Sequence, residues 1–488
     1  AATRVDENGL VNYAEVLGSD LLVNGDYTNG LTGWGTQIPS GQIVEVTSNQ
    51  LHIDYDTSQT QGSTGVFQTI LTLTKTYKTT IDIASVTGTF KVQVGNVIHT
   101  ITTPGIKTFY NVASDTAIFI GRKSNAQGFE ATINSVSVKE VTRDNVPRID
   151  YTGGGCPHIL AEPQRTNTVT YSEDFSQWSG NFITLVPNQL SPDGTLSATK
   201  ISGTIGVSSL FFGGDSSTTA SRSIYARTVT GTGTAKLMSY FGNTNNTFNL
   251  TEEWQRFELT GSISTGGVNF YIDFRGSQTL GEFIIWGGQS EEGSYATSYI
   301  PTSGSAVTRN QDIFTRDGIG SLINSTEGVL FLEVAALSLT SILEMITLSD
   351  GSYSNVVMFR YYDTSSNDMQ VQVRVAGVTT ASILFTLTDA KDFNKIAFKY
   401  KENDFALWVN GVEVGTDTSG ITFTSSTLNK LSFDRGDGGN PLFGKVKQLQ
   451  VYDTALTDNQ LIQLTGEAGT HFFESYAEMA EALTYTIQ

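Results

Sequence analysis

From Leu21 to about Val141, hydrophobic residues alternate with Thr, Ser or charged residues in short segments. A period of two is typical of strands that bury one face. Eight such segments, repeating about every ten residues, predict a two-sheet jelly-roll sandwich over residues 20–141. The segments are Ile43–Val46, Leu51–Tyr55, Gly65–Leu73, Tyr77–Val86, Thr89–Val94, Lys107–Asn111, Ala117–Gly121 and Thr132–Glu140.

Two later blocks repeat the alternation and predict two more β-sandwiches, over residues 167–312 and 313–466. In the last block, Asn410-Gly411 separates two apolar runs, a strong hairpin signal because both turn positions favour positive φ. The predicted strands are Ser221–Val229, Ala235–Phe241, Gln255–Gly261 and Val268–Phe274 in the second sandwich, and Asn355–Tyr362, Met369–Val375, Asn394–Tyr400, Phe405–Val414 (the hairpin) and Leu428–Phe433 in the third.

Two segments break the alternation. Residues 142–166 contain three prolines and the run Gly153 to Gly155, which predict an extended connector with one sharp turn. Residues 467–488 carry apolar side chains three or four positions apart, which predict a short amphipathic helix. The predicted fold class is therefore all-β, with tandem β-sandwich (jelly-roll) domains and a short C-terminal helix.

The charge balance narrows the range of partners. Forty-eight acidic residues against 29 basic ones give a net charge of −19 and an isoelectric point near 4.6. Such a chain repels phosphate backbones and anionic lipid surfaces, which argues against nucleic-acid binding. No apolar run approaches the roughly 20 residues that cross a bilayer, so membrane insertion is not expected.

Catalytic and redox motifs are absent from the sequence. One cysteine excludes an internal disulfide framework, and the four histidines lack metal-ligand spacing. There is no G-x-S-x-G elbow, P-loop or H-E-x-x-H motif. Adjacent carboxylates such as Glu291 and Glu292 would point to opposite faces of a strand, which does not suit a glycosidase pair. We predict that the protein is not an enzyme.

Aromatic residues supply candidates for sugar stacking. Trp34, Trp178 and Trp286 could each present a ring to a pyranose, and burial in a core is the alternative for each. Tyr361 and Tyr362 are adjacent on a predicted strand and must point to opposite sides, so one of them can be exposed.

The loop Phe433–Pro441 gathers Asp434, Asp437 and Asn440. Oxygen ligands at this spacing suit calcium, and a solvated turn is the alternative interpretation. No cofactor is required by the sequence, and structural calcium is the only candidate.

Several segments resemble modules of phage tail fibres and other virion surface proteins. They are PRIDY, the glycine-cysteine-proline turn, LAEPQRTN and YSEDFSQW between residues 147 and 178, and EFIIWGGQSEEGSYATSYIPTSGSAVTRNQD at 282–312. In that group an ATRV…NGL strand comes shortly before PRIDY. Here ATRV…NGL lies at residues 2–10, far before PRIDY at residues 147–151. The resemblance implies that residues 1–19 form a strand segment pairing with the connector, and that a domain is inserted between about Asp20 and Val141. It also implies that the chain is a fragment or processed product, or that a neighbouring subunit supplies the pairing strand.

Two further resemblances concern individual domains. The phrases VNGDYTNGLTGW and INSVSVKE resemble galactose-binding-like carbohydrate-binding modules, in which the first loop and last strand often hold calcium. That resemblance makes Asn24, Asp26 and Glu140 candidate ligands, with a simple turn as the alternative. The hairpin WVNG and the closing segment NPLFGKVKQLQVYDTALT resemble the concanavalin A-like lectin/laminin-G family.

Together these resemblances imply a bacteriophage virion protein, a tail fibre, spike or capsid decoration, made in the host cytoplasm and exposed on the particle surface. We expect host attachment through cell-surface glycans, contacts with other virion proteins, and a homo-oligomer, with a trimer favoured and a pentamer as the alternative. A purely architectural virion protein, a capsule depolymerase and a secreted bacterial adhesin are the alternatives.

Overall fold

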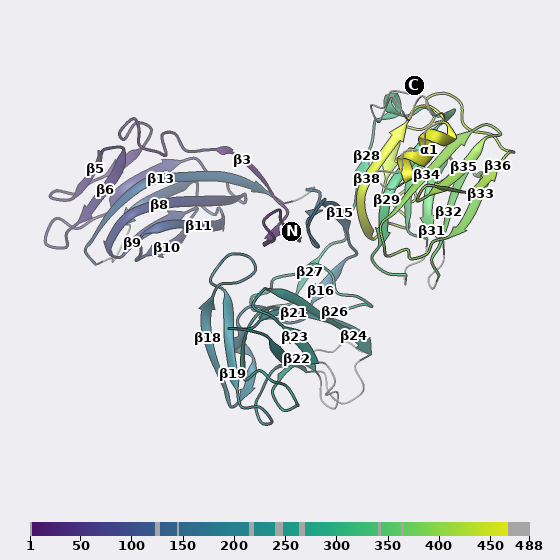
Figure 1. The fold of residues 1–488 in the computed structure, drawn as a ribbon. Coiled ribbons are helices and arrows are strands. Elements are labelled where there is room, and N and C mark those ends of the chain that lie inside the picture. Colours follow the sequence, from purple (N-terminus) through teal and green to yellow (C-terminus); the bar gives the residue numbers. More distant parts are fainter. Residues whose placement is uncertain are drawn as a thin grey trace, which may run out of the picture. The chain divides into compact units, whose positions relative to one another are not determined.

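The computed structural model describes residues 2–122, 127–143, 146–213, 219–239, 247–262, 269–339, 343–362 and 366–466. Almost every element in these ranges is a strand (Figure 1), which confirms the predicted all-β fold class. The chain forms two compact units, one from Glu15–Val146 and the other from Ala1–Ala14 with Pro147–Gln488. The first unit thus interrupts the sequence of the second.

The unit Glu15–Val146 is a sandwich of two antiparallel sheets. One has the order β10-β9-β12-β7-β4, and the other β11-β8-β13-β6-β5 with β3 paired to β13. Their alternate side chains, such as Leu51, Ile53 and Tyr55 of β6, are buried between the sheets. The strands are β3 (Val16–Asp20), β4 (Gly35–Gln37), β5 (Ile43–Thr47), β6 (Gln50–Tyr55), β7 (Thr64–Thr69), β8 (Thr76–Gly88), β9 (Phe90–Val94), β10 (Val97–Ile101), β11 (Gly105–Val112), β12 (Ala117–Arg122) and β13 (Phe129–Thr142).

All eight segments predicted for this sandwich form strands, and β3, β4 and β10 are additional. The predicted N-terminal boundary differs from the structure. Residues 16–20 pair with β13 inside this sandwich, whereas we predicted residues up to 19 to pair with the connector.

The second sandwich lies in the larger unit and also has two antiparallel sheets. Their orders are β17-β20-β25-β22-β23 and β18-β19-β26-β21-β24. The strands are β17 (Ser179–Asn181), β18 (Ile183–Gln189), β19 (Ala198–Gly203), β20 (Ser209–Phe212), β21 (Thr219–Arg227), β22 (Gly233–Ser239), β23 (Thr247–Leu250), β24 (Gln255–Ser262), β25 (Phe270–Asp273) and β26 (Glu282–Glu292). A short 3-10 helix, η1 (Phe175–Gln177), precedes it, and β16 (Arg165–Asn167) pairs with β27 (Val307–Arg309) beside it.

The C-terminal sandwich, also in the larger unit, has sheets of order β28-β37-β30-β31-β32-β33 and β14-β15-β38-β29-β34-β35-β36. Its elements are β14 (Ile149–Asp150), β15 (His158–Ala161), β28 (Thr315–Arg316), η2 (Gly320–Leu322), β29 (Glu327–Ala336), β30 (Met345–Ser349), β31 (Val356–Tyr361), β32 (Asp368–Val375), β33 (Val378–Thr386), β34 (Asn394–Lys401), β35 (Phe405–Val409), β36 (Val412–Asp417), β37 (Lys430–Ser432) and β38 (Gly444–Tyr452). The connector strands β14 and β15 therefore extend a sheet of this domain, because Ile159 of β15 pairs with Val446 of β38.

The N-terminal hairpin of the larger unit consists of β1 (Thr3–Val5) and β2 (Val11–Tyr13). It meets the connector through a hydrogen bond from the Tyr151 backbone N–H to the Val5 carbonyl. The segment thus contacts the connector at its start, while its own strands pair with each other.

The described part of the chain contains one α-helix, α1 (Asp458–Thr465), with a capping box between Thr457 and Gln460. It packs Leu461 onto Val329, Phe331 and Trp408 of the last sandwich. The helix predicted over residues 467–488 lies outside the described residues. Within the ranges described, no helix has the length and apolar character needed to span a membrane.

Candidate functional site

Trp34 and Trp178, two of the three tryptophans considered as sugar platforms, are core residues. The Trp34 side chain is buried, and its indole N–H donates to the Asn24 carbonyl at 3.0 Å. Trp178 is also buried, and its indole N–H donates to the Tyr171 carbonyl at 2.9 Å. Each ring is packed among other aromatic rings, so neither offers a free face to a sugar, and these two assignments are corrected.

One of the two adjacent tyrosines Tyr361 and Tyr362 is buried and the other is exposed, as their positions on a strand predict. Tyr361 is buried against Phe359, so it too is corrected from platform to core. Tyr362 is 41% exposed, and the Arg360 guanidinium lies 5.1 Å from its ring centroid. Trp286 is buried as well. Tyr362 therefore remains the exposed candidate of the predicted set.

The candidate calcium ligands of the first sandwich are engaged in separate interactions. The Asn24 amide donates to two carbonyls of its own loop, and the Asp26 carboxylate accepts from Thr28. The Glu140 carboxylate pairs with Lys75 at 2.9 Å. These contacts organise a turn and a surface ion pair, as the simpler interpretation of the sequence expected.

The loop candidates Asp434, Asp437 and Asn440 do not fit a calcium site as they stand. The Asp434 side chain is buried and accepts two backbone N–H groups of its own loop. Asp437 is paired with Arg435 at 2.9 Å, so a cation would have to displace a guanidinium. Asn440 adopts a positive φ of 52° at the end of this turn. Across the described ranges no group of three His, Cys, Asp or Glu residues is placed to hold a metal ion.

The adjacent carboxylates Glu291 and Glu292 on β26 point to opposite faces, as predicted. Glu291 is fully buried, and its carboxylate accepts hydrogen bonds from the Thr297 hydroxyl and backbone N–H. Burial raises the pKa of Glu291, although these hydrogen bonds oppose the shift. Because Glu292 is exposed on the other face, the two cannot act on one glycosidic bond.

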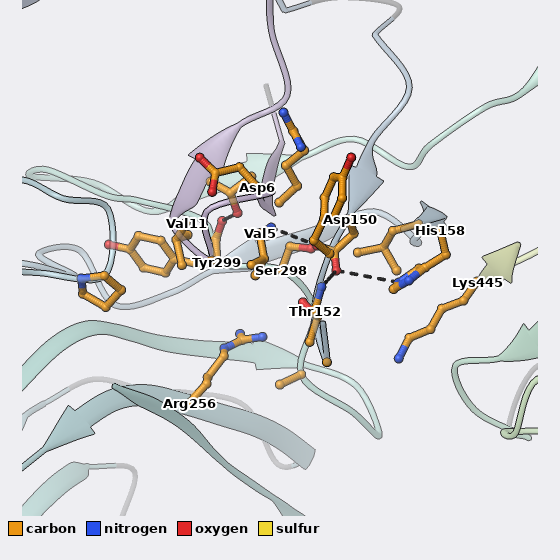
Figure 2. Close-up of a pocket in the computed structure, with 18 of the residues that line it drawn as sticks. Val5, Asp6, Val11, Asp150, Thr152, His158, Arg256, Ser298, Tyr299 and Lys445 are labelled. Carbon is orange, nitrogen blue, oxygen red and sulfur yellow. Dashed lines mark hydrogen bonds and ion pairs between the residues drawn. The ribbon is translucent and has the colours of Figure 1, made fainter. Parts of the chain in front are cut away.

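A cavity of about 830 Å³ opens in the larger unit (Figure 2). Its size falls within the roughly 300–1,000 Å³ typical of small-molecule sites. Most of its lining comes from the β1–β2 hairpin, the connector, residues 254–258 and 295–299 of the second sandwich, and the start of β38. Segments far apart in sequence therefore form one concave surface.

The connector turn contributes an open stretch of backbone. Gly153, Gly154 and Gly155 have φ values of +90°, +72° and +77°, which side chains rarely adopt. A Cβ atom built on any of the three meets no atom within 4 Å, so the backbone is open to approach there. Asp150 holds the start of the turn by accepting the Thr152 backbone N–H at 2.8 Å.

Asp150 and His158 form a buried pair at the wall of the cavity. The His158 Nε2 atom lies 3.7 Å from the Asp150 carboxylate and has no hydrogen bond within the described part of the chain. Asp150 also accepts the Val5 backbone N–H, which ties the hairpin to the turn. Burial lowers the pKa of His158, and Lys445 and Lys447 lower it further against the opposing charge of Asp150. The imidazole is therefore neutral at neutral pH.

Three cationic side chains line the cavity: Arg4 of the hairpin, Arg256 of the second sandwich and Lys445 of the last sandwich. Arg256 of β24 donates to the Ser223 hydroxyl and the Thr297 carbonyl and pairs with Glu258 at 3.3 Å. Lys445 of β38 is half-buried. Its ammonium makes no ion pair or hydrogen bond within the ranges described.

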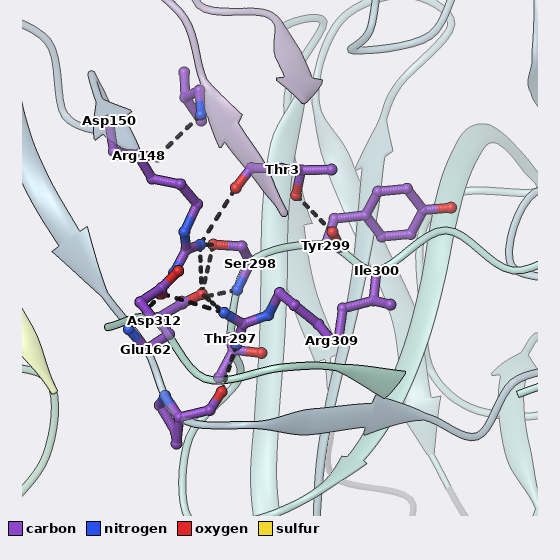
Figure 3. A network of polar contacts seen from close by, with 12 residues as sticks. Thr3, Arg148, Asp150, Glu162, Thr297, Ser298, Tyr299, Ile300, Arg309 and Asp312 are labelled. Atoms are coloured by element: carbon purple, nitrogen blue, oxygen red, sulfur yellow. Dashed lines mark hydrogen bonds and ion pairs between the residues drawn. The ribbon is translucent and has the colours of Figure 1, made fainter. Parts of the chain in front are cut away.

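A buried ionic cluster of Arg148, Glu162, Arg309 and Asp312 lies beside the cavity (Figure 3). The Arg148 guanidinium is 1% exposed; one nitrogen donates to Glu162 at 2.7 Å and the other to Asp312. Arg309 lies 3.2 Å from Glu162 and donates to the Pro163 carbonyl. The two positive and two negative charges balance, as burial requires.

The ionic cluster joins segments from three regions of the sequence. Arg148 also donates to the Thr3 carbonyl and the Ser298 hydroxyl, and Ser298 in turn donates to Glu162. Thr3, Glu162 and Ser298 line the cavity as well. The hairpin, the connector and the end of the second sandwich are thereby fixed around one wall of the cavity.

The ionic cluster predicts acid sensitivity. Burial alone would raise the pKa of Glu162, but the guanidinium groups of Arg148 and Arg309 and several hydrogen bonds lower it to about 2. Since the unfolded chain binds this proton near pH 4.5 and the folded chain only near 2, the stabilisation is complete above pH 4.5 and is lost as the pH falls toward 2. We expect a loss on the order of 3 kcal/mol from this group, measured by denaturant unfolding between pH 5 and pH 2.5.

Glu327→Gln is the control for this titration, because Glu327 forms an exposed pair with Lys401. It should retain the steep fall in stability, whereas Glu162→Gln should flatten it. Equal pH dependence in the two variants would contradict the assignment.

The cavity residues were not among the sequence-predicted site residues. Arg256 lies in no motif; His158 lies between the glycine-cysteine-proline turn and LAEPQRTN, and Lys445 lies in the closing segment that resembles the lectin/laminin-G family, but the sequence assigned none of the three a role. The sequence did contain one signal for the cavity region. The phrases PRIDY, LAEPQRTN and VTRNQD, which resemble virion surface proteins, contain the charged residues Arg148, Asp150, Glu162, Arg309 and Asp312. That resemblance implied no binding or catalytic role for these residues.

Comparison with known proteins gives one family match. The profile of the concanavalin A-like lectin/glucanases superfamily, of the Laminin_G_3 type, matches residues 339–462. The comparison with curated proteins gave no match.

Among solved structures, the carbohydrate-binding module CBM40 of the Ruminococcus gnavus IT-sialidase is 19% identical, with 29% of this chain and 84% of that chain covered and a TM-score of 0.26. A SAP-like pentraxin from Limulus polyphemus is 14% identical over 31% of this chain and 75% of its own, with a TM-score of 0.26. Domains LG4-5 of the mouse laminin alpha1 chain are 10% identical over 64% of this chain and 93% of their own, with a TM-score of 0.24. The family match at residues 339–462, which fall in the two antiparallel sheets of the last sandwich, identifies the C-terminal region of this chain as a concanavalin A-like lectin/laminin-G domain.

Proposed function

We propose that the protein is a bacteriophage virion component that is exposed on the particle surface and attaches to the host by binding cell-surface glycans. The observation that carries the proposal is the concanavalin A-like lectin domain matched at residues 339–462. The segments that resemble virion surface proteins supply the context, and they lie at the connector and at the end of the second sandwich. The protein would be made in the host cytoplasm and act outside the cell, on the particle.

Attachment through such a domain gains from several copies. Linked weak sites bind a cell surface far more tightly than one site because the later binding events are intramolecular. We therefore propose a homo-oligomer, with a trimer favoured over a pentamer, held among other virion proteins. Binding without catalysis is consistent with the orientation of Glu291 and Glu292, which point to opposite faces of β26.

The ionic cluster favours a second candidate, a purely architectural virion protein. Three buried charges and the partly buried Asp312, which together fix a hairpin, a connector and a sandwich, would suit a rigid spacer without a ligand. The two candidates differ in what the isolated protein does to host cells.

We expect the purified full-length chain to bind glycans on an array and, when preincubated with host cells, to reduce adsorption of the phage. The heat-unfolded chain is the control and should do neither. A blank array together with unchanged adsorption would contradict attachment and favour the architectural role.

A further inference from the structure

The carboxylates that line the cavity are occupied by the protein itself. Asp6 accepts backbone N–H groups of its own hairpin and the Asn12 amide, and Asp150 accepts the two backbone N–H groups described above. Glu258 pairs with Arg256, and Glu7 lies 3.9 Å from Arg4. Glu162 belongs to the ionic cluster. Each of these carboxylates therefore already has a hydrogen bond or an ion pair within the protein.

The donors of the cavity are less completely used. The Lys445 ammonium has no partner within the described residues, and neither do the backbone N–H groups of Gly153 and Gly155. A lysine ammonium offers three donors and a full positive charge. Backbone N–H groups in a tight turn add partial positive charge, and such turns bind anions. The groups of this lining that have no protein partner are thus hydrogen-bond donors, which suit an anionic ligand.

The lining also includes aromatic surface. Tyr151 and Trp254 are half-buried and line the same cavity, and the Arg227 guanidinium lies 5.4 Å from the Trp254 ring centroid. Rings of this kind provide apolar contact area, while the polar tip of each can remain solvated. A ligand that combines a flat apolar face with hydroxyls and one negative charge matches these groups.

We propose that this cavity binds a carboxylate-bearing sugar, with Lys445 and the free N–H groups of the glycine turn holding the carboxylate and Tyr151 and Trp254 contacting the ring. The inference rests on the proposed glycan binding and names its ligand class. The site is assembled from the connector, the second sandwich and the first residues of β38. It therefore requires the intact larger unit and not the lectin domain alone.

Lys447 is a matched control for Lys445. It lies two positions further along β38 and carries the same charge. It differs in being partnered, since its ammonium lies 3.7 Å from Glu333 and 3.9 Å from the Phe393 ring centroid, and it does not line the cavity.

The test measures binding of the full-length chain to trigalacturonic acid and to 3′-sialyllactose by calorimetry. The neutral counterparts are the trimethyl ester of trigalacturonic acid and the methyl ester of 3′-sialyllactose. We expect an acidic sugar to bind at least about tenfold more tightly than its neutral counterpart, and Lys445→Met to remove roughly tenfold in affinity, as loss of a charge-assisted hydrogen bond predicts. Lys447→Met should bind as the unmodified chain does, and thermal unfolding should show both variants folded.

Equal affinity for acidic and neutral sugars, or equal affinity of the two lysine variants, would overturn the inference while leaving glycan binding intact. If neither acidic probe binds while neutral glycans bind on the array, the inference is likewise overturned and glycan binding is left intact. A blank array and no binding of any probe would overturn the inference and the proposed function together. Preference for one acid over the other would identify the source of the carboxylate.

Discussion

Replacement of Arg148 by Met is expected to destabilise the larger unit by about 3–5 kcal/mol, the usual cost of removing one partner from a buried ion pair. The side chain is 1% exposed and supplies hydrogen bonds to Glu162, Asp312, Ser298 and the Thr3 carbonyl. Methionine fills much of the same volume but leaves Glu162 and Asp312 buried beside Arg309 alone. The excess negative charge must then either take up a proton or open the cluster to water.

Calorimetric unfolding measures this loss of stability, and the unfolding of the other unit in the same chain serves as an internal reference. Arg148 belongs to the larger unit, so the transition of the sandwich 15–146 should keep its temperature while that of the larger unit falls. Lys401→Met is the matched control, since Lys401 pairs with Glu327 at the surface and should contribute less than about 1 kcal/mol. A shift no larger than that of the control would contradict a structural role for the ionic cluster.

A double variant separates the buried pair from a general packing defect. If Arg148 and Glu162 act on each other, the variant carrying both Arg148→Met and Glu162→Gln should lose less stability than the two single changes added together. If the two single losses of stability simply add, the destabilisation by Arg148→Met comes from lost packing around Arg148 and not from its pairing with Glu162. The outcome also bears on the cavity, because Glu162 and Thr3 line it and depend on Arg148 for their positions.

The strands of this protein were largely predictable because most of them bury alternate side chains. In β6, for example, Leu51, Ile53 and Tyr55 are buried and the residues between them are less so, which is the period of two seen in the sequence. Strand β3 was not predicted, since all five of its residues are exposed and its place at a sheet edge depends on pairing with β13. Helix α1 carried a readable signal, the capping box from Thr457 to Gln460.

The candidate site was much less predictable than the strands. The connector was expected to be extended, yet its pairing with β38 joins Ile159 to Val446 and leaves no trace in local pattern. The same long-range pairing brings Lys445 to the cavity. Charges such as Arg148 and Asp312 look like surface residues in sequence, because burial of a charge depends on partners that only the fold brings together.

Replacement of Trp178 by Ala should cost the second sandwich about 3–5 kcal/mol, since a large buried ring is removed and a cavity is left behind. The ring contacts Phe175 and Phe270 at centroid distances of 5.0 and 5.3 Å. Its indole N–H also holds the Tyr171 carbonyl, which would lose its partner. Had Trp178 been a sugar platform, the same change would have removed binding and left the fold intact.

Tyr362→Ala is the counterpart, because Tyr362 is exposed and its removal should change stability by less than about 0.5 kcal/mol. Calorimetry of the two variants, together with glycan binding, distinguishes core from platform. Trp178→Phe should restore part of the lost stability because it returns apolar volume without the N–H donor. A folded Trp178→Ala protein with unchanged unfolding temperature would show that the ring is not part of the core that holds the second sandwich together.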